Sequence, residues 1–132
     1  MAQKVIMDSN FFFIPSQFRI DIFEAMMNLL NQKYEPILLS TTLQELQKMA
    51  EKGAPALRKQ ARIALKLAER CQLVNVERNK RESGDDVIAR VAAEWKCAVA
   101  TNDSALRRRL RDISIPVIYL RQKSRLELEG SL

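Results

Sequence analysis

The 132-residue chain contains no histidine, and this absence removes several classes of catalytic site at once. Without an imidazole there is no Ser-His-Asp triad, no Cys-His pair and no histidine-bound zinc. The two cysteines, Cys71 and Cys97, lie far apart in the sequence, so neither a disulfide framework nor a cysteine metal site is indicated. Any chemistry must therefore use carboxylates, hydroxyls or amines.

Glycine and long apolar runs are also scarce. The three glycines, Gly53, Gly84 and Gly130, are too few and too dispersed to build a phosphate-binding P-loop or a dinucleotide fingerprint. No segment approaches the ~20 apolar residues that span a bilayer, and residues 1–4 lack the charged-then-apolar pattern of a signal peptide. We therefore expect a soluble, cytoplasmic protein that does not act on a membrane.

Length and charge limit the number of domains and the kind of partner. A chain of this length with 47% hydrophobic residues can form one compact core but not two domains of usual size. We expect a single domain over residues 1–132, in which the residues after about 121 form a basic C-terminal extension. The net charge of +6 favours a polyanionic partner, because each Lys or Arg that neutralises a phosphate releases counterions.

Short apolar strands alternate with amphipathic helices along the chain. Strands are expected at residues 4–8, 36–40, 73–76, 97–100 and 116–120. Helices are expected at residues 22–30, 57–71, 85–96 and 104–113, with one more that is N-capped by Thr41 or Thr42 and ended by Gly53 and Pro55. Because parallel strands need long crossovers, this order predicts an α/β fold with a parallel five-stranded sheet in a three-layer α/β/α arrangement.

Four acidic residues fall where such a fold binds ligands, at the carboxyl ends of the strands. Asp8 closes the first strand, Asp103 follows the fourth, Glu45 lies in the helix after the second, and Asp85 begins the helix before the fourth. Clustered carboxylates repel one another unless a divalent cation joins them, and oxygen ligands select Mg²⁺ or Mn²⁺. We therefore predict that these four acids are catalytic and bind the metal, with Asp8 as the central ligand.

Each acid also has an ordinary structural interpretation, which the sequence leaves open. Asp8 is compatible with an Asx-turn, Glu45 with a surface glutamate, and Asp85 with a helix cap. Helical phase separates Asp85 from its neighbour, because Asp85 lies three residues before the apolar Ile88. Asp86 is instead expected to face solvent as an anion at the helix N-terminus.

Polar residues beside the acids are expected to surround the site and to orient its carboxylates through hydrogen bonds. They are Ser9, Asn10, Asp86, Thr101 and Asn102. Oxygen-bound Mg²⁺ or Mn²⁺ activates water and neutralises charge on phosphate oxygens, so a phosphodiester is the natural substrate.

Basic residues crowd the segment after the fourth acid. Seven of them, against two acidic residues, lie between positions 103 and 125. Those expected to contact the backbone of such a phosphodiester substrate are Arg107, Arg108, Arg111, Arg121, Lys123 and Arg125. Leu106, Leu110 and Ile113 are expected on the buried side of the helix; a merely solvated basic face is the alternative. We also expect one of the phenylalanines at positions 11–13 to stack on a base and at least two to lie in the core.

Four segments resemble the motifs of the PIN-domain nucleases, in the order found in that family. They are Val5–Asn10, Thr42–Leu46, Asp85–Ala89 and Ala100–Asp103. The resemblance implies a strand order of 3-2-1-4-5, hydrolysis that leaves a 5′-phosphate, and Asp8, Glu45, Asp85 and Asp103 as the family's acids. Residues 103–109 and 115–122 most resemble the ribosomal-RNA-processing PIN endonucleases of the small-subunit processome, particularly archaeal ones. This implies RNA as substrate and ribosome-assembly proteins as partners.

Other functions remain open at this point. A VapC-type toxin ribonuclease, normally inhibited by a paired antitoxin, has the same acids, and a non-catalytic RNA-binding or assembly module has the same fold. A phosphorylatable receiver domain is disfavoured, because it needs paired acids after the first strand. A haloacid-dehalogenase-like phosphatase needs an aspartate where Asn10 stands. The adjacent Met26 and Met27 suggest a homodimer through the first long helix.

Overall fold

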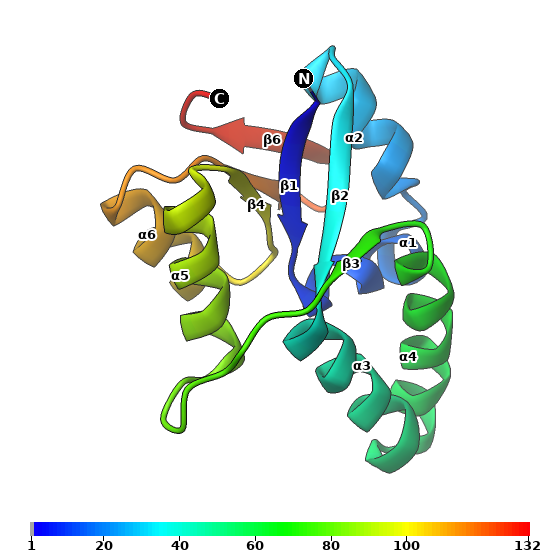
Figure 1. Cartoon of the computed structure of the whole chain (residues 1–132). Coiled ribbons are helices and arrows are strands. Elements are labelled where there is room, and N and C mark those ends of the chain that lie inside the picture. Colours follow the sequence, from blue (N-terminus) through cyan, green and yellow to red (C-terminus); the bar gives the residue numbers. More distant parts are fainter. Residues whose placement is uncertain (1) are drawn as a thin grey trace.

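A computed structural model describes residues 2–132 as a six-stranded sheet with helices on both faces (Figure 1). The strands are β1 (Gln3–Met7), β2 (Tyr34–Leu39), β3 (Gln72–Val74), β4 (Ala98–Ala100), β5 (Val117–Arg121) and β6 (Arg125–Glu129). Their order is β3-β2-β1-β4-β5-β6, and every pair from β3 to β5 is parallel. The predicted α/β class and the order 3-2-1-4-5 are therefore confirmed.

The sixth strand corrects the prediction of a basic C-terminal extension. β6 pairs antiparallel with β5, in a register that places Tyr119 opposite Glu127. Gln122 and Lys123 make the reversal with positive φ angles of 54° and 59°. Leu126 is buried, and charged residues precede and follow it, which is the alternation of a strand with one covered face. This segment is thus an edge of the sheet.

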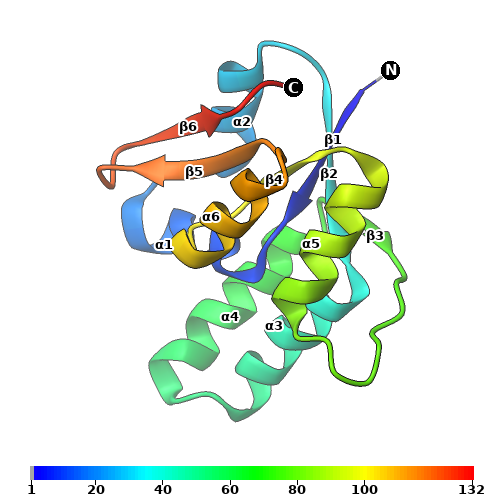
Figure 2. The same cartoon turned by 90° about the vertical axis from the view of Figure 1, so that its left-hand side faces the viewer.

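Helices form the outer two layers of the fold. One face carries η1 (Ser9–Phe13), α1 (Ile14–Phe18), α2 (Ile22–Leu30), α3 (Ser40–Lys52) and α4 (Pro55–Ala68), and the other carries α5 (Gly84–Trp95) and α6 (Ser104–Asp112). Side chains of β1 alternate between the two cores: Val5 and Met7 join the first, and Ile6 joins the second. Figure 2 shows α5 and α6 together on their side of the sheet. The three-layer arrangement follows from strands that are apolar on both faces.

All three phenylalanines of η1 lie in the core. Phe11 and Phe12 are fully buried and Phe13 is nearly so. They belong to the apolar cluster that α3 and α4 enclose, so none is free to stack on a base. The prediction that one of them contacts RNA is wrong, because neighbouring helices cover the whole turn that follows β1.

Two further local predictions are wrong. Helix α3 begins at Ser40, and no side chain caps it, so neither Thr41 nor Thr42 is its N-cap. The Ser40 hydroxyl instead accepts from the backbone N–H of Val76 at 3.0 Å, which ties the end of β2 to the segment after β3. Ile113, expected in the core, is 48% exposed, because α6 ends at Asp112 and the chain turns there.

The first long helix, α2, divides its two methionines. Met26 is fully buried, whereas Met27 is 59% exposed. One exposed methionine does not make a large apolar patch, so the homodimer stays a prediction. No helix within residues 2–132 has both the length and the apolar character needed to cross a membrane.

Replacement of Phe12 by Ala is expected to lower the free energy of unfolding by about 3–5 kcal/mol, because the change opens a cavity in the core. Met27→Ala on exposed helix surface is the control, with an expected change within about 0.5 kcal/mol. Urea denaturation followed by circular dichroism measures both variants. Similar losses in the two variants would contradict the placement of η1 in the core.

Candidate active site

The four acids come from four separate elements and meet at one edge of the sheet. Asp8 directly follows β1, and Asp103 is the N-cap of α6, which follows β4. Glu45 lies on α3, and Asp85 lies in the first turn of α5. The carboxyl end of β1 and the N-terminus of α3 lie together at the lower edge of the sheet in Figure 1.

Asp8 is the most buried of the four, with only 3% of its surface exposed. Its carboxylate accepts three hydrogen bonds: from the Ser9 N–H at 2.8 Å, from Asn10 Nδ2 at 2.9 Å and from Thr101 Oγ1 at 2.7 Å. Burial raises the pKa of Asp8, the hydrogen bonds from Thr101 and Ser9 oppose this rise, and the charge of Glu45 adds to it. A nearby cation would therefore stabilise the ionised carboxylate.

Thr101 and Asn10 join the ends of β1 and β4. The fully buried Thr101 hydroxyl donates to Asp8 and accepts from the Asp103 N–H at 3.1 Å. The Asn10 side-chain oxygen accepts from the Asn102 N–H at 2.8 Å. Ser9 and Asn102 thus contribute backbone N–H groups to this network. The predicted surroundings of Asp8 are assembled, partly through main-chain donors.

Asp85 experiences the other acids directly. Burial raises its pKa most, the charges of Asp8 and Asp103 raise it further, and Arg109 opposes the rise. Asp103 uses one oxygen as a helix cap, since Oδ1 accepts from the N–H groups of Ala105 at 2.9 Å and Leu106 at 3.3 Å. The structural role expected of an aspartate at a helix start therefore falls to Asp103. Asp85 therefore lies close enough to Asp8 and to Asp103 to be repelled by both carboxylates.

Glu45 reaches this group because Gly84 makes room for it. A Cβ atom at Gly84 would collide with Glu45 Oε1, so any larger residue at the start of α5 would push the carboxylate away. The scarcity of glycine in the sequence excluded phosphate-binding loops but did not predict this contact. The available signal was a glycine immediately before the acidic pair.

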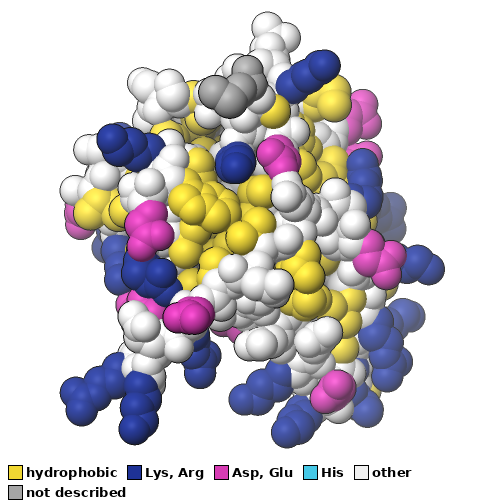
Figure 3. Space-filling view, in the orientation of Figure 1, with side chains coloured by type: hydrophobic (Ala, Val, Ile, Leu, Met, Phe, Trp, Pro, Cys, Tyr) yellow, Lys and Arg dark blue, Asp and Glu magenta, His cyan; other side chains and the backbone are white. Residues whose placement is uncertain are grey.

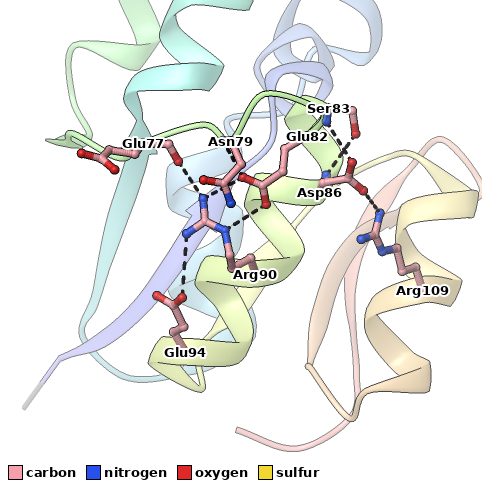
Figure 4. Close-up of polar contacts among 8 residues, drawn as sticks. All are labelled: Glu77, Asn79, Glu82, Ser83, Asp86, Arg90, Glu94 and Arg109. Atoms are coloured by element: carbon pink, nitrogen blue, oxygen red, sulfur yellow. Dashed lines mark hydrogen bonds and ion pairs between the residues drawn. The ribbon is translucent and has the colours of Figure 1, made fainter.

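Asp86 lies outside the acid group and closes the start of α5 (Figure 4). It forms a capping box with Ser83 and an ion pair with Arg109 on α6, in which Arg109 Nη1 lies 2.6 Å from Asp86 Oδ1. The Ser83 N–H and the Arg109 guanidinium lower the pKa of Asp86 to about 2. The pair joins the two helices that carry Asp85 and Asp103. Sequence reasoning missed Arg109 in this role, because its partner is 23 positions away.

The loop between β3 and α5 is held against the protein by Arg90 (Figure 4). Arg90 Nε pairs with Glu82 at 2.9 Å, and its Nη2 donates to the Glu77 carbonyl at 2.7 Å. The Glu82 carboxylate is thereby paired, and three basic side chains of the loop remain exposed: Arg78, Lys80 and Arg81. Figure 3 shows Lys and Arg side chains gathered at the tip of this loop and across the hollow from it, over α3 and α4. No functional role was predicted for this loop from the sequence.

The predicted RNA-contacting residues divide into two groups. Arg111 pairs with Glu129 at 3.5 Å, and Arg121 and Arg125 pair with Glu127 at 3.0 and 3.3 Å. These three guanidinium groups stabilise the β5–β6 edge. Arg107 lies over the Tyr119 ring, and Arg108 and Lys123 are exposed. The free positive charge after Asp103 is thus smaller than the sequence predicts.

The donor chemistry of the site suits a hard divalent cation. The four acids offer only oxygen atoms, which Mg²⁺ and Mn²⁺ prefer. Within residues 2–132 no group of three Asp, Glu or Cys side chains lies close enough together to hold a metal ion on its own. Mg²⁺ does not need one, because it keeps several waters and binds through one or two carboxylates together with substrate phosphates. The residues therefore fit the ion as an open site.

Comparisons with known proteins agree with this geometry. A family model described as "PIN like domain" matches residues 5–123. The rRNA-processing protein FCF1 of Saccharomyces cerevisiae is 33% identical over 118 residues, which cover 87% of this chain and 58% of that protein. The ribonuclease VapC4 of Methanocaldococcus jannaschii is 30% identical over 132 residues, which cover 96% of this chain and 97% of that protein. The PIN domain endonuclease Utp24 has a solved structure that superposes with a TM-score of 0.81 at 32% identity, covering 98% of this chain and 92% of that one.

Replacement of Asp85 by Asn is expected to stabilise the protein in EDTA at pH 7 by about 0.5 kcal/mol, the scale of a solvent-screened charge pair. The folded protein raises the pKa of Asp85, so ionisation at this position costs stability as pH rises above the ordinary aspartate pKa of 3.8. The gain from Asn is therefore present at neutral pH and disappears at pH values below 3.8, where Asp85 is protonated in both states. Thermal unfolding from pH 3 to 8 measures it; Asp112→Asn is the exposed control. A loss of stability at pH 7 would contradict the repulsion.

Proposed function

This chain belongs to the PIN-like domain family, and we propose that it is an endoribonuclease that uses Mg²⁺ or Mn²⁺ to hydrolyse phosphodiester bonds in RNA. PIN-domain nucleases are generally endoribonucleases that use divalent metal ions, although some PIN proteins are not catalytic. The observation that carries the proposal is the convergence of four carboxylates from four elements on one edge of the sheet. A structural protein gains nothing from this repulsion.

Asp8, Glu45, Asp85 and Asp103 are the residues that we propose hold the metal. Once bound, a divalent cation would supply positive charge for a phosphate oxygen and lower the pKa of a water molecule. Asp8 has the central position, because its carboxylate is the most buried and is fixed by three hydrogen bonds. Asp103 keeps one oxygen free of the helix cap, and Glu45 approaches from the opposite helix layer.

Other residues hold the carboxylates in place. Thr101 bonds both Asp8 and the main chain of Asp103, so it sets the position of one acid against the other. The Asp86–Arg109 pair does the same for α5 and α6. Such fixed arrangements lower the cost of reorganising charges during hydrolysis, because the protein has already oriented its groups.

RNA is the substrate that the charge distribution supports. Basic side chains gather at the tip of the β3–α5 loop, which leads to Asp85, and over α3 and α4, of which α3 carries Glu45 (Figure 3). The similarity to FCF1 and to Utp24 supports a precursor of ribosomal RNA as the target, with ribosome-assembly proteins as partners. Because the chain spans little more than half of FCF1, these finer assignments are proposals for this domain alone.

One observation favours a second candidate, a VapC-type ribonuclease. The match to VapC4 extends over nearly the whole of both chains, whereas the match to FCF1 does not. The ion pairs of Arg111, Arg121 and Arg125 also offset part of the positive charge in the segment that resembles the ribosomal-RNA-processing enzymes. Both candidates use the same four acids and differ in the RNA that is cut.

Purified protein is expected to cleave end-labelled RNA in Mn²⁺ or Mg²⁺, and EDTA is expected to stop the cleavage. Asp8→Asn is expected to reduce the rate at least about 100-fold, the scale seen when one group that stabilises transition-state charge is lost. Asp21→Asn is the matched control, because Asn caps α2 as well as Asp does. Precursor ribosomal RNA and unrelated RNAs of equal length are compared side by side. Binding without cleavage in every metal would favour the non-catalytic module.

A further inference from the structure

Four arginines stand on α6, and one of them is both fixed and uncompensated. Arg109 pairs with Asp86, and Arg111 pairs with Glu129. Arg108 is exposed. Arg107 makes no ion pair within residues 2–132, yet its guanidinium carbon lies 4.0 Å from the centre of the Tyr119 ring. The Tyr119 ring therefore fixes the position of Arg107, and the positive charge of Arg107 remains available to a ligand.

Tyr119 is itself a fixed platform. It lies on β5, which β4 and β6 border on either side, and it packs against the apolar cluster under α5 and α6. Its hydroxyl donates to Glu127 Oε2 at 3.2 Å. A guanidinium held by one face on such a ring keeps its N–H edges free, and these edges carry its hydrogen-bond donors.

Arg107 and Tyr119 line a cavity of about 220 Å³ that also includes Asp103. Thr101, Asn102 and Ser104 complete its polar wall. The cavity therefore begins at one of the four acids and extends away from them along the first turn of α6, between α6 and β5. Figure 2 shows α6 lying in front of β5 on this side of the molecule.

We propose that this cavity binds a phosphodiester of the RNA beside the bond that is cut, and that Arg107 is the residue that holds it. The inference rests on the proposed nuclease function. A planar guanidinium offers two parallel N–H donors to a phosphate, which a lysine ammonium does not. The Ser104 hydroxyl and the Asn102 amide supply neutral donors at the same wall. Because the contact is to phosphate, this cavity positions RNA without reading its sequence.

Two pairs of variants test the assignment. Arg107→Lys keeps the charge but loses the flat donor edge, and Arg70→Lys makes the same change at an exposed arginine that also lies over an aromatic ring, that of Phe23. Tyr119→Leu removes the ring, and Tyr119→Phe removes only the hydroxyl. Binding is measured by fluorescence anisotropy with a labelled single-stranded RNA. EDTA prevents metal-dependent cleavage, and in this buffer the acids repel the RNA equally in the wild type and in every variant.

Arg107→Lys is expected to weaken RNA binding about tenfold, the scale of one charge-assisted hydrogen-bonded contact, with Arg70→Lys within about twofold of the wild type. Tyr119→Leu is expected to match Arg107→Lys, and Tyr119→Phe to match the wild type. Thermal unfolding of each variant establishes that it is folded. Equal affinities of Arg107→Lys and Arg70→Lys, or full affinity of Tyr119→Leu, would overturn the inference.

The failure of the inference is distinguishable from the failure of the nuclease function. Metal-dependent cleavage with no special effect of Arg107→Lys on binding would overturn the phosphate cavity and leave the nuclease in place. Arg107-dependent binding with no cleavage in any metal would support the cavity in an RNA-binding module and overturn the enzyme. A wild-type protein that does not bind RNA would overturn both.

Discussion

The site depends on one buried carboxylate. Asp8 ends the central strand β1, is 3% exposed, and would not tolerate a negative charge there without compensation. Ser9, Asn10 and Thr101 supply three hydrogen-bond donors, but Glu45 adds repulsion. Asp8 is thus a partly compensated anion, and a cation bound beside it would complete the compensation. The pKa of Asp85 is raised by burial and by the charges of Asp8 and Asp103, so the negative charge of the site is incompletely compensated at Asp85 as well.

The sheet topology explains why these charges meet. β1 lies between β2 and β4, so the chain leaves β1 towards one side and later returns to pair with it from the other. Crevices form at the carboxyl ends of strands where the order reverses in this way. Four connections converge there and each contributes an acid: Asp8 follows β1, Asp103 begins α6, Asp85 lies in the first turn of α5 and Glu45 in the second turn of α3. Repulsion between the acids lowers the stability of the fold at this edge, and apolar burial in the two cores offsets this loss.

Local signals sufficed for some features and failed for others. Asp8 and Asp103 could be placed from strand ends, and Asp85 could be separated from Asp86 by helical phase, because those patterns extend over a few residues. The contact of Glu45 with Gly84 and the pair between Asp86 and Arg109 join distant segments, so no local pattern contains them. Strand β6 escaped prediction because its charged residues suggested a solvated tail, whereas Glu127 pairs with arginines on its own hairpin.

A titration of Mn²⁺ against thermal stability tests the central claim most directly, because a cation that binds only the folded protein raises its stability in proportion to the logarithm of its concentration. At about 100 times the dissociation constant the gain should be about 2.7 kcal/mol for the wild type and for the Asp21→Asn control. Asp8→Asn should show little or none of it. An unchanged melting temperature in the wild type, or an equal rise in Asp8→Asn, would contradict a cation site built on Asp8.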